Sequence, residues 1–131
     1  FFGAMHYWFP KITGKMYNTR FANIGLILFF TGFITLYGPM FYLGFKGMPR
    51  RYYDYDQIFH PGNIISTMGS WVLYFGLAII IINLFYSLKG GSKAPSDPWG
   101  GKTLEWTISS PPSIENFEET PVITKGPYDY K

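Results

Sequence analysis

Two long runs without a charged residue dominate the hydropathy pattern of the chain. One covers residues 21–45 and the other residues 63–88, and both are rich in Phe, Ile, Leu and Tyr. At about 1.5 Å per residue, a helix over the first run is roughly 37 Å long, more than the bilayer hydrocarbon core of about 30 Å. The pattern therefore predicts an all-α membrane protein with two full transmembrane helices.

A third apolar stretch, residues 1–9, precedes Pro10 and Lys11. It is too short to cross a bilayer, and Pro10 disfavours a helical conformation at Phe9. We expect residues 1–9 to be the end of a truncated transmembrane helix that stops at Phe9. The alternative is an interfacial anchor, since aromatic rings beside a lysine are typical of headgroup depth.

Small residues recur within both long runs and predict close packing between helices. In the first run these are Gly25, Gly32, Gly38 and Gly44, and in the second they are Ser66, Thr67, Gly69 and Ser70. Pro39 removes a backbone donor and predicts a bend near the end of the first helix.

The remaining segments differ sharply in character. Residues 10–20 form a polar, basic loop, and residues 46–62 form a second loop that is dense in charge and aromatic side chains. Residues 89–131 hold six of the ten prolines, which predicts an extended tail without much regular structure. Large apolar groups in this tail predict that it docks onto a protein surface; they are Trp99, Leu104, Trp106, Ile108 and Phe117.

The distribution of basic residues predicts the orientation of the helices. One side carries Lys11, Lys15, Arg20, Lys89 and Lys93, and the other carries Lys46, Arg50 and Arg51. The positive-inside rule places the first group, with the tail, on the cytoplasmic or matrix side, and loop 46–62 on the outer side.

Composition narrows the chemistry further. Hydrophobic residues make up 47% of the chain and charged residues only 15%, against about 25% in average chains. With no cysteine, disulfides, thiolate metal sites and a cysteine nucleophile are excluded. The net charge of +3 is read as loop charge, so no nucleic-acid partner is expected. We predict no catalytic residue and no metal ligand, since His6 and His60 are far apart and read as interfacial side chains.

The adjacent pair Arg50 and Arg51 is the best candidate for a binding site. Two guanidinium groups suit fixed anionic partners, because each can hold a carboxylate through two parallel hydrogen bonds. The alternatives are contacts with lipid phosphates or local ion pairs with Asp54 and Asp56.

Four motifs, in this order, resemble subunit I of the haem-copper cytochrome c oxidases. They are His6-Tyr-Trp-Phe-Pro-Lys-Ile-Thr-Gly-Lys-Met-Tyr-Asn18, Gly47-Met-Pro-Arg-Arg-Tyr-Tyr-Asp-Tyr55, Ile64-Ile-Ser-Thr-Met-Gly-Ser70 and Asp97-Pro-Trp-Gly-Gly-Lys-Thr-Leu-Glu-Trp-Thr107. The resemblance covers essentially the whole chain and places it at the last two membrane helices and tail of that subunit. Ser110-Pro-Pro112 and Asn116-Phe117 continue the fourth motif.

This resemblance implies the function. The whole subunit reduces O₂ to water with electrons from cytochrome c and pumps protons, using two haems and a copper. In the family the paired arginines bind haem propionates, which assigns Arg50 and Arg51 as cofactor-binding residues. The resemblance places the iron and copper ligands outside this chain, so the fragment alone is expected to be inactive. Expected partners are the remainder of subunit I, other oxidase subunits, cytochrome c and membrane lipid.

The chain also departs from the family pattern. Many relatives carry Gln-His after the proline of the eleventh helix, whereas Pro39 here is followed by Met40 and Phe41, and Asp56 stands where a proline is usual. The Pro-Arg-Arg-Tyr-x-Asp-Tyr form favours cytochrome c over quinol as donor, and we expect a bacterial plasma membrane rather than a mitochondrial inner membrane. The alternative function is a small non-enzymatic membrane protein that packs within a larger complex.

Overall fold

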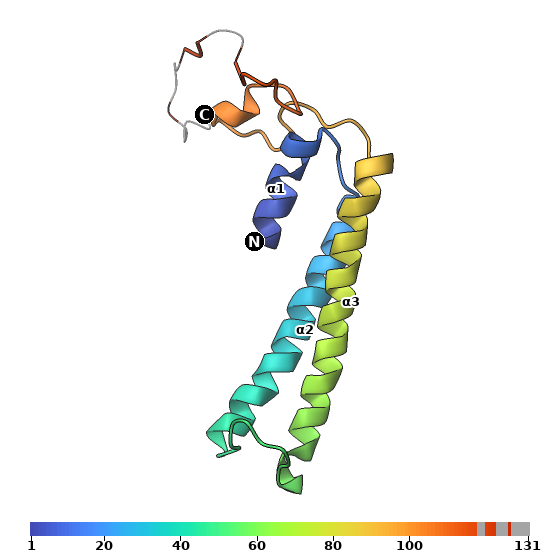
Figure 1. Cartoon of the computed structure of the whole chain (residues 1–131), viewed down its shortest axis with the longest axis vertical. Coiled ribbons are helices and arrows are strands. Elements are labelled where there is room, and N and C mark those ends of the chain that lie inside the picture. Colours follow the sequence, from blue (N-terminus) through green and yellow to red (C-terminus); the bar gives the residue numbers. More distant parts are fainter. Residues whose placement is uncertain (118–119, 123–125, 127–131) are drawn as a thin grey trace. The chain divides into compact units, whose positions relative to one another are not determined.

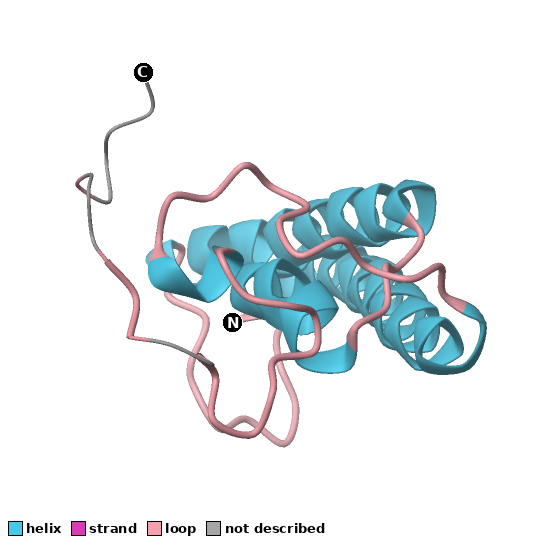
Figure 2. Ribbon diagram, turned by 90° about the horizontal axis from the view of Figure 1, so that it is seen from above, coloured by secondary structure: helices cyan, strands magenta, loops and turns pink. Residues whose placement is uncertain are grey.

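The computed structural model describes residues 1–117, 120–122 and 126, and its regular structure there is helical (Figures 1 and 2). The elements in chain order are α1 (Phe2–Thr13), α2 (Thr19–Phe45), the 3₁₀ turn η1 (Gln57–Phe59), α3 (His60–Gly90) and the 3₁₀ turn η2 (Leu104–Trp106). Extended pairing in these residues is limited to one isolated antiparallel bridge between Lys15 and Lys93. The predicted all-α fold is confirmed.

The chain divides into two compact units. The tail unit consists of Phe1–Asn18 and Leu84–Lys131, so it combines α1 with the end of α3 and the tail. The hairpin unit is Thr19–Asn83, which contains α2, the loop after it and most of α3.

In the hairpin unit, α2 and α3 run side by side (Figure 1). Thr19–Phe45 (27 residues) and Gln57–Gly90 (34 residues) are long and apolar enough to cross a membrane. Both candidate spans are longer than the uncharged runs that predicted them. Helix α3 already begins at His60, within the predicted loop 46–62. Pro39 lies inside α2.

Glycines set the spacing between α2 and α3. A Cβ at Gly32 would collide with the backbone of Leu73, and a Cβ at Gly69 would collide with the backbone of Leu36. A Cβ at Gly25 would instead collide with the side chain of Ile80, which is 2% exposed. The predicted close packing is therefore confirmed at these positions. Gly38 and Gly44 have open space where a Cβ would stand, so they do not contribute to this contact.

In the tail unit, α1 continues past Pro10, so the predicted helix end at Phe9 is wrong. The helix ends at Thr13, and Gly14 closes it in the left-handed conformation (φ 67°), donating its N–H to the Pro10 carbonyl at 2.9 Å. Pro10 is fully buried. Pro10 has no backbone N–H to donate within the helix. The burial of its ring and the contacts between the next turn of α1 and the tail offset this loss.

Lys11 makes the central contact of that turn. Its ammonium donates hydrogen bonds to the carbonyl oxygens of Ser96 and Ile108, both at 2.8 Å, and it lies 5.2 Å from the centre of the Trp106 ring. Only 5% of Lys11 is exposed, and this burial lowers the pKa of its ammonium although Asp97 and Glu105 oppose the shift. The last turn of α1 is thus held by the tail.

Aromatic side chains complete the contact between α1 and the tail. The Trp106 ring packs edge-on against Tyr7 at 5.0 Å and is 2% exposed, while Trp99 stacks on Tyr7 at 6.3 Å. Docking of the tail, which its large apolar groups predicted, is confirmed for these two tryptophans. Apart from η2, the described part of the tail after Gly90 is loop (Figure 2), as predicted.

Candidate functional site

Arg50 and Arg51 lie in the loop that leaves α2. The helix ends in a Schellman motif, in which Met48 donates its N–H to the Leu43 carbonyl at 3.0 Å and Gly47 donates to Gly44 at 3.1 Å. Gly47 has φ 90°, the left-handed conformation that this motif requires. The arginines follow after Pro49, so a fixed helix end positions the start of their loop.

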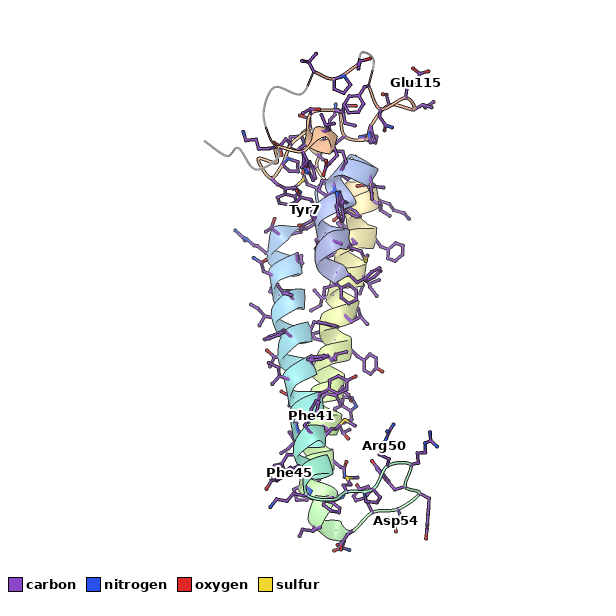
Figure 3. The ribbon with its side chains drawn as sticks, turned by 90° about the vertical axis from the view of Figure 1, so that its left-hand side faces the viewer. Tyr7, Phe41, Phe45, Arg50, Asp54 and Glu115 are labelled. Carbon is purple, nitrogen blue, oxygen red and sulfur yellow. The ribbon has the colours of Figure 1, made fainter. Side chains whose placement is uncertain are left out.

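The two aspartates of the loop are engaged with backbone groups. Asp54 accepts a hydrogen bond from the Tyr55 N–H at 2.8 Å, and Asp56 caps η1 by accepting from the Ile58 N–H at 3.2 Å. Figure 3 shows the Arg50 side chain pointing away from Asp54. Within the part of the chain that the structure describes, neither arginine forms an ion pair with these aspartates. Of the alternatives for the arginines, the local Arg–Asp pair is therefore absent from this structure.

Arg51 adopts a backbone conformation that is unusual for its residue type. Its φ is 58°, in the left-handed region, where a Cβ crowds the backbone at a cost of about 1–2 kcal/mol. Both arginine side chains are exposed. Strained backbone conformations cluster at functional sites, which makes Arg51 a candidate binding residue.

A polar hollow of about 350 Å³ lies within the hairpin unit, between the helices and this loop. Its lining includes Leu36, Met40, Tyr52, Tyr55, Asn63, Ser66, Thr67 and Ser70. The Ser66 hydroxyl is buried without a hydrogen-bond partner among the described residues. A space of this size and polarity can hold water.

Sequence reasoning assigned Ser66, Thr67 and Ser70 to helix packing and missed their role in lining the hollow. The signal was available, because Asn63, Ser66, Thr67 and Ser70 follow the spacing of one helix face. Ser66 is buried as predicted, whereas Thr67 is exposed towards the hollow.

The two histidines lie in different units. His60 begins α3, and its Nδ1 is 3.3 Å from the Tyr55 hydroxyl. His6 bonds through Nδ1 to the Phe2 carbonyl at 2.8 Å and packs edge-on against Tyr17, where burial raises the pKa of the tyrosine hydroxyl. Among the described residues, no group of three or more His, Cys, Asp or Glu side chains could hold a metal ion.

Comparison with known proteins finds a family match that covers the arginine loop. Residues 1–72, which include α1, α2 and the whole loop, match the family model described as cytochrome c and quinol oxidase polypeptide I. The chain belongs to this oxidase subunit I family.

The matches to individual relatives continue past residue 72 and include the tail of this subunit I chain. It is 47% identical over 98% of its length to cytochrome c oxidase subunit 1 of Thermostichus vulcanus, and 46% identical over 98% to that of Synechocystis sp.. It is 43% identical over 93% of its length to the haem-copper oxidase subunit I+III of Aeropyrum pernix. The chain spans 23% of the length of the first two relatives and 15% of the third.

Proposed function

We propose that this chain is the C-terminal part of the catalytic subunit of a proton-pumping terminal oxidase, in which Arg50 and Arg51 hold haem propionates. The whole enzyme would oxidise cytochrome c and reduce O₂ to water. The observation that carries the assignment is the pair of adjacent, exposed guanidinium groups whose neighbouring aspartates already accept backbone hydrogen bonds.

The chemistry of the two side chains fits carboxylate ligands. A guanidinium has five donors in a rigid fork and remains charged at all physiological pH values, so it can hold a carboxylate bidentately. Beside an apolar membrane unit, such a pair would keep both propionates ionised and would raise the reduction potential of the haem through its positive charge. Bound haem supplies electron transfer, and the arginines contribute orientation and charge.

The role of this chain alone would be limited. Its helices would form scaffold and its loop would contact the propionates, while the ligands of the two haem irons and the copper would come from the remainder of subunit I. Other oxidase subunits and membrane lipid would surround it, and the separate chain would be inactive.

The test compares Arg50→Gln and Arg51→Gln with Lys46→Gln in the purified oxidase complex. Lys46 is a matched control, since it is a basic residue at the same helix end whose ammonium lies over the Tyr42 ring. We expect both arginine variants to lower a haem midpoint potential and shift its reduced-minus-oxidised bands, with iron ligation retained. Unchanged potentials and bands in both variants would show that the arginines do not contact haem.

Two finer assignments follow from the loop sequence and the charge distribution. The Pro-Arg-Arg-Tyr-x-Asp-Tyr form, and relatives named cytochrome c oxidase, support cytochrome c rather than quinol as the donor. Turnover with reduced cytochrome c and none with a quinol is the expected result.

The basic residues support an orientation with the tail in the cytoplasm and loop 46–62 outside, and the similarity to relatives such as that of Thermostichus vulcanus supports a bacterial plasma membrane. Because the chain has no cysteine, a thiol introduced into it can be scored as labelling of this region above that of the unaltered complex. Tyr53→Cys, at a fully exposed position, should react with an impermeant maleimide from outside, and Ser113→Cys only from the cytoplasm. The reverse pattern would invert the orientation.

A further inference from the structure

The isolated bridge between Lys15 and Lys93 pairs the backbones of two lysines in the tail unit. Met16 donates its N–H to the Ser92 carbonyl at 2.8 Å, and Ala94 donates to Gly14 at 2.9 Å. These bonds flank the lysine pair instead of joining it, which defines a non-hydrogen-bonded pair. In such a pair the two Cα atoms are about 4.5 Å apart and both side chains leave on one face. The two lysine stems therefore start side by side.

The backbone around the pair is fixed. Ala94 is 5% exposed and Gly14 is buried. Gly14 also lies close to the tail, since a Cβ added to it would be 2.6 Å from Pro111. The two lysines cannot separate unless these contacts open. Lys15 is half-buried and Lys93 is exposed, so the ammonium ends remain accessible.

The pair has no acidic partner among the described residues. No acidic residue precedes Asp54 in the sequence, and the described acids of the tail unit are Asp97, Glu105 and Glu115. Asp97 accepts hydrogen bonds from the Trp99 and Gly101 N–H groups, and it interacts with Lys11 together with Glu105. Like charges directly opposite each other in a bridge are destabilising, so an external anion between them would stabilise the fold.

The position of the bridge along the chain indicates which kind of anion the two lysines bind. Lys93 follows closely on Gly90, where the second candidate membrane span ends, so the bridge lies at the depth of lipid headgroups. Trp8 and Trp99 of the same unit are 44% and 40% exposed, as is typical of side chains at a membrane surface. We propose that Lys15 and Lys93 together bind the phosphate of an anionic phospholipid. The proposal rests on the tail unit alone and does not depend on the arginine loop.

The experiment uses the purified oxidase complex that contains this chain, in nanodiscs of phosphatidylcholine with a rising fraction of phosphatidylglycerol. Retained phosphatidylglycerol is counted by native mass spectrometry. We compare wild type with the Lys15→Gln/Lys93→Gln double variant and with Lys102→Gln, an exposed lysine of the same tail as control. The double variant should bind phosphatidylglycerol roughly 30-fold more weakly, the scale of two lysines at an anionic surface, and Lys102→Gln should match wild type.

Competition distinguishes the lipid from a free anion. Inorganic phosphate at millimolar concentration should leave the retained phosphatidylglycerol unchanged, because a dissolved ion lacks the membrane anchoring of a lipid. Displacement by phosphate would show a free-anion site and overturn the lipid assignment. Equal retention by the double variant and wild type would show that the lysine pair binds no lipid. The haem spectra of the variants should stay unchanged, which separates this test from that of the arginines.

Discussion

The Trp99 indole Nε1 donates a hydrogen bond of 2.9 Å to the backbone carbonyl of Tyr7, 92 positions earlier in the chain. The same two rings stack at 6.3 Å. One residue pair therefore joins α1 to the tail through a polar and an apolar contact at once.

Trp99→Phe removes the indole donor but keeps a ring against Tyr7. A single hydrogen bond of this kind contributes about 1 kcal/mol, so opening of the tail should become about fivefold more frequent. Hydrogen exchange of the Trp106 amide, which donates to the Thr103 carbonyl at 3.0 Å, reports this opening. Trp71→Phe on α3, where the side chain is 69% exposed, is the control and should exchange like wild type. Equal exchange in the two variants would contradict the prediction.

Lys11→Met keeps the length of the side chain but removes the ammonium that bonds to Ser96 and Ile108. Leaving these carbonyl groups without their donor should cost about 1–3 kcal/mol of tail docking. The readout is thiol labelling of Ser110→Cys, at a buried position, relative to Ser113→Cys at an exposed one. Lys102→Met is the control, and a labelling ratio as low as that of wild type would argue against the contact.

The lowered pKa of Lys11 predicts that the docking of the tail depends on pH, which the same labelling assay can measure. Burial in the docked tail lowers the pKa of Lys11 below its ordinary value of 10.5, which applies when the tail is undocked. At pH values between the docked and the undocked pKa, the undocked state therefore binds more protons than the docked state. Docking should therefore strengthen as pH rises from the docked pKa towards 10.5, and weaken again as pH falls. Lys11→Met should abolish this dependence; a slope that persists in the variant would assign it to another group.

Gly32→Ala and Gly38→Ala form a matched pair on α2. The new methyl group at Gly32 would collide with the Leu73 backbone, whereas that at Gly38 would meet open space. Gly38→Ala should be neutral or stabilising by up to about 1 kcal/mol through helix propensity. Gly32→Ala should destabilise the hairpin by about 1–3 kcal/mol. Thermal unfolding of the purified complex gives the comparison, and equal midpoints would refute close contact at Gly32.

Arg51→Gly and Arg51→Ala both remove the guanidinium but differ in backbone strain. At a φ of 58° glycine is unstrained and alanine is not, so the loop should be about 1 kcal/mol more stable with glycine. Hydrogen exchange of the Ile58 amide, bonded to Asp56, measures loop opening. Faster or equal exchange in Arg51→Gly would indicate that the left-handed conformation is not maintained.

Long-range contacts explain where local sequence rules failed. The two membrane spans were predictable, because an uncharged apolar run of about 25 residues or more rarely forms anything other than a transmembrane helix. The helix end was not, because the effect of Pro10 on Phe9 is local, whereas the carbonyl groups that hold Lys11 lie 85 and 97 positions away. No rule based on neighbouring residues contains that information.

Residue type alone also could not separate the glycines. Gly25, Gly32, Gly38 and Gly44 are identical in the sequence, and only the register of α2 against α3 shows which of them touch the partner helix. The arginine pair was found from its sequence context. The polar hollow was missed, because it forms only when the loop residues Tyr52 and Tyr55 come over the polar face of α3.

The discontinuity of the tail unit has a consequence for biogenesis. Residues Phe1–Asn18 have their packing partners in Leu84–Lys131, so this unit cannot close until the ribosome has made the entire hairpin between them. The hairpin, whose contacts join sequence-adjacent helices, can assemble earlier. During synthesis α1 therefore cannot make its contacts with the tail until the tail has emerged, so the docking of the tail is a late step in the folding of this region.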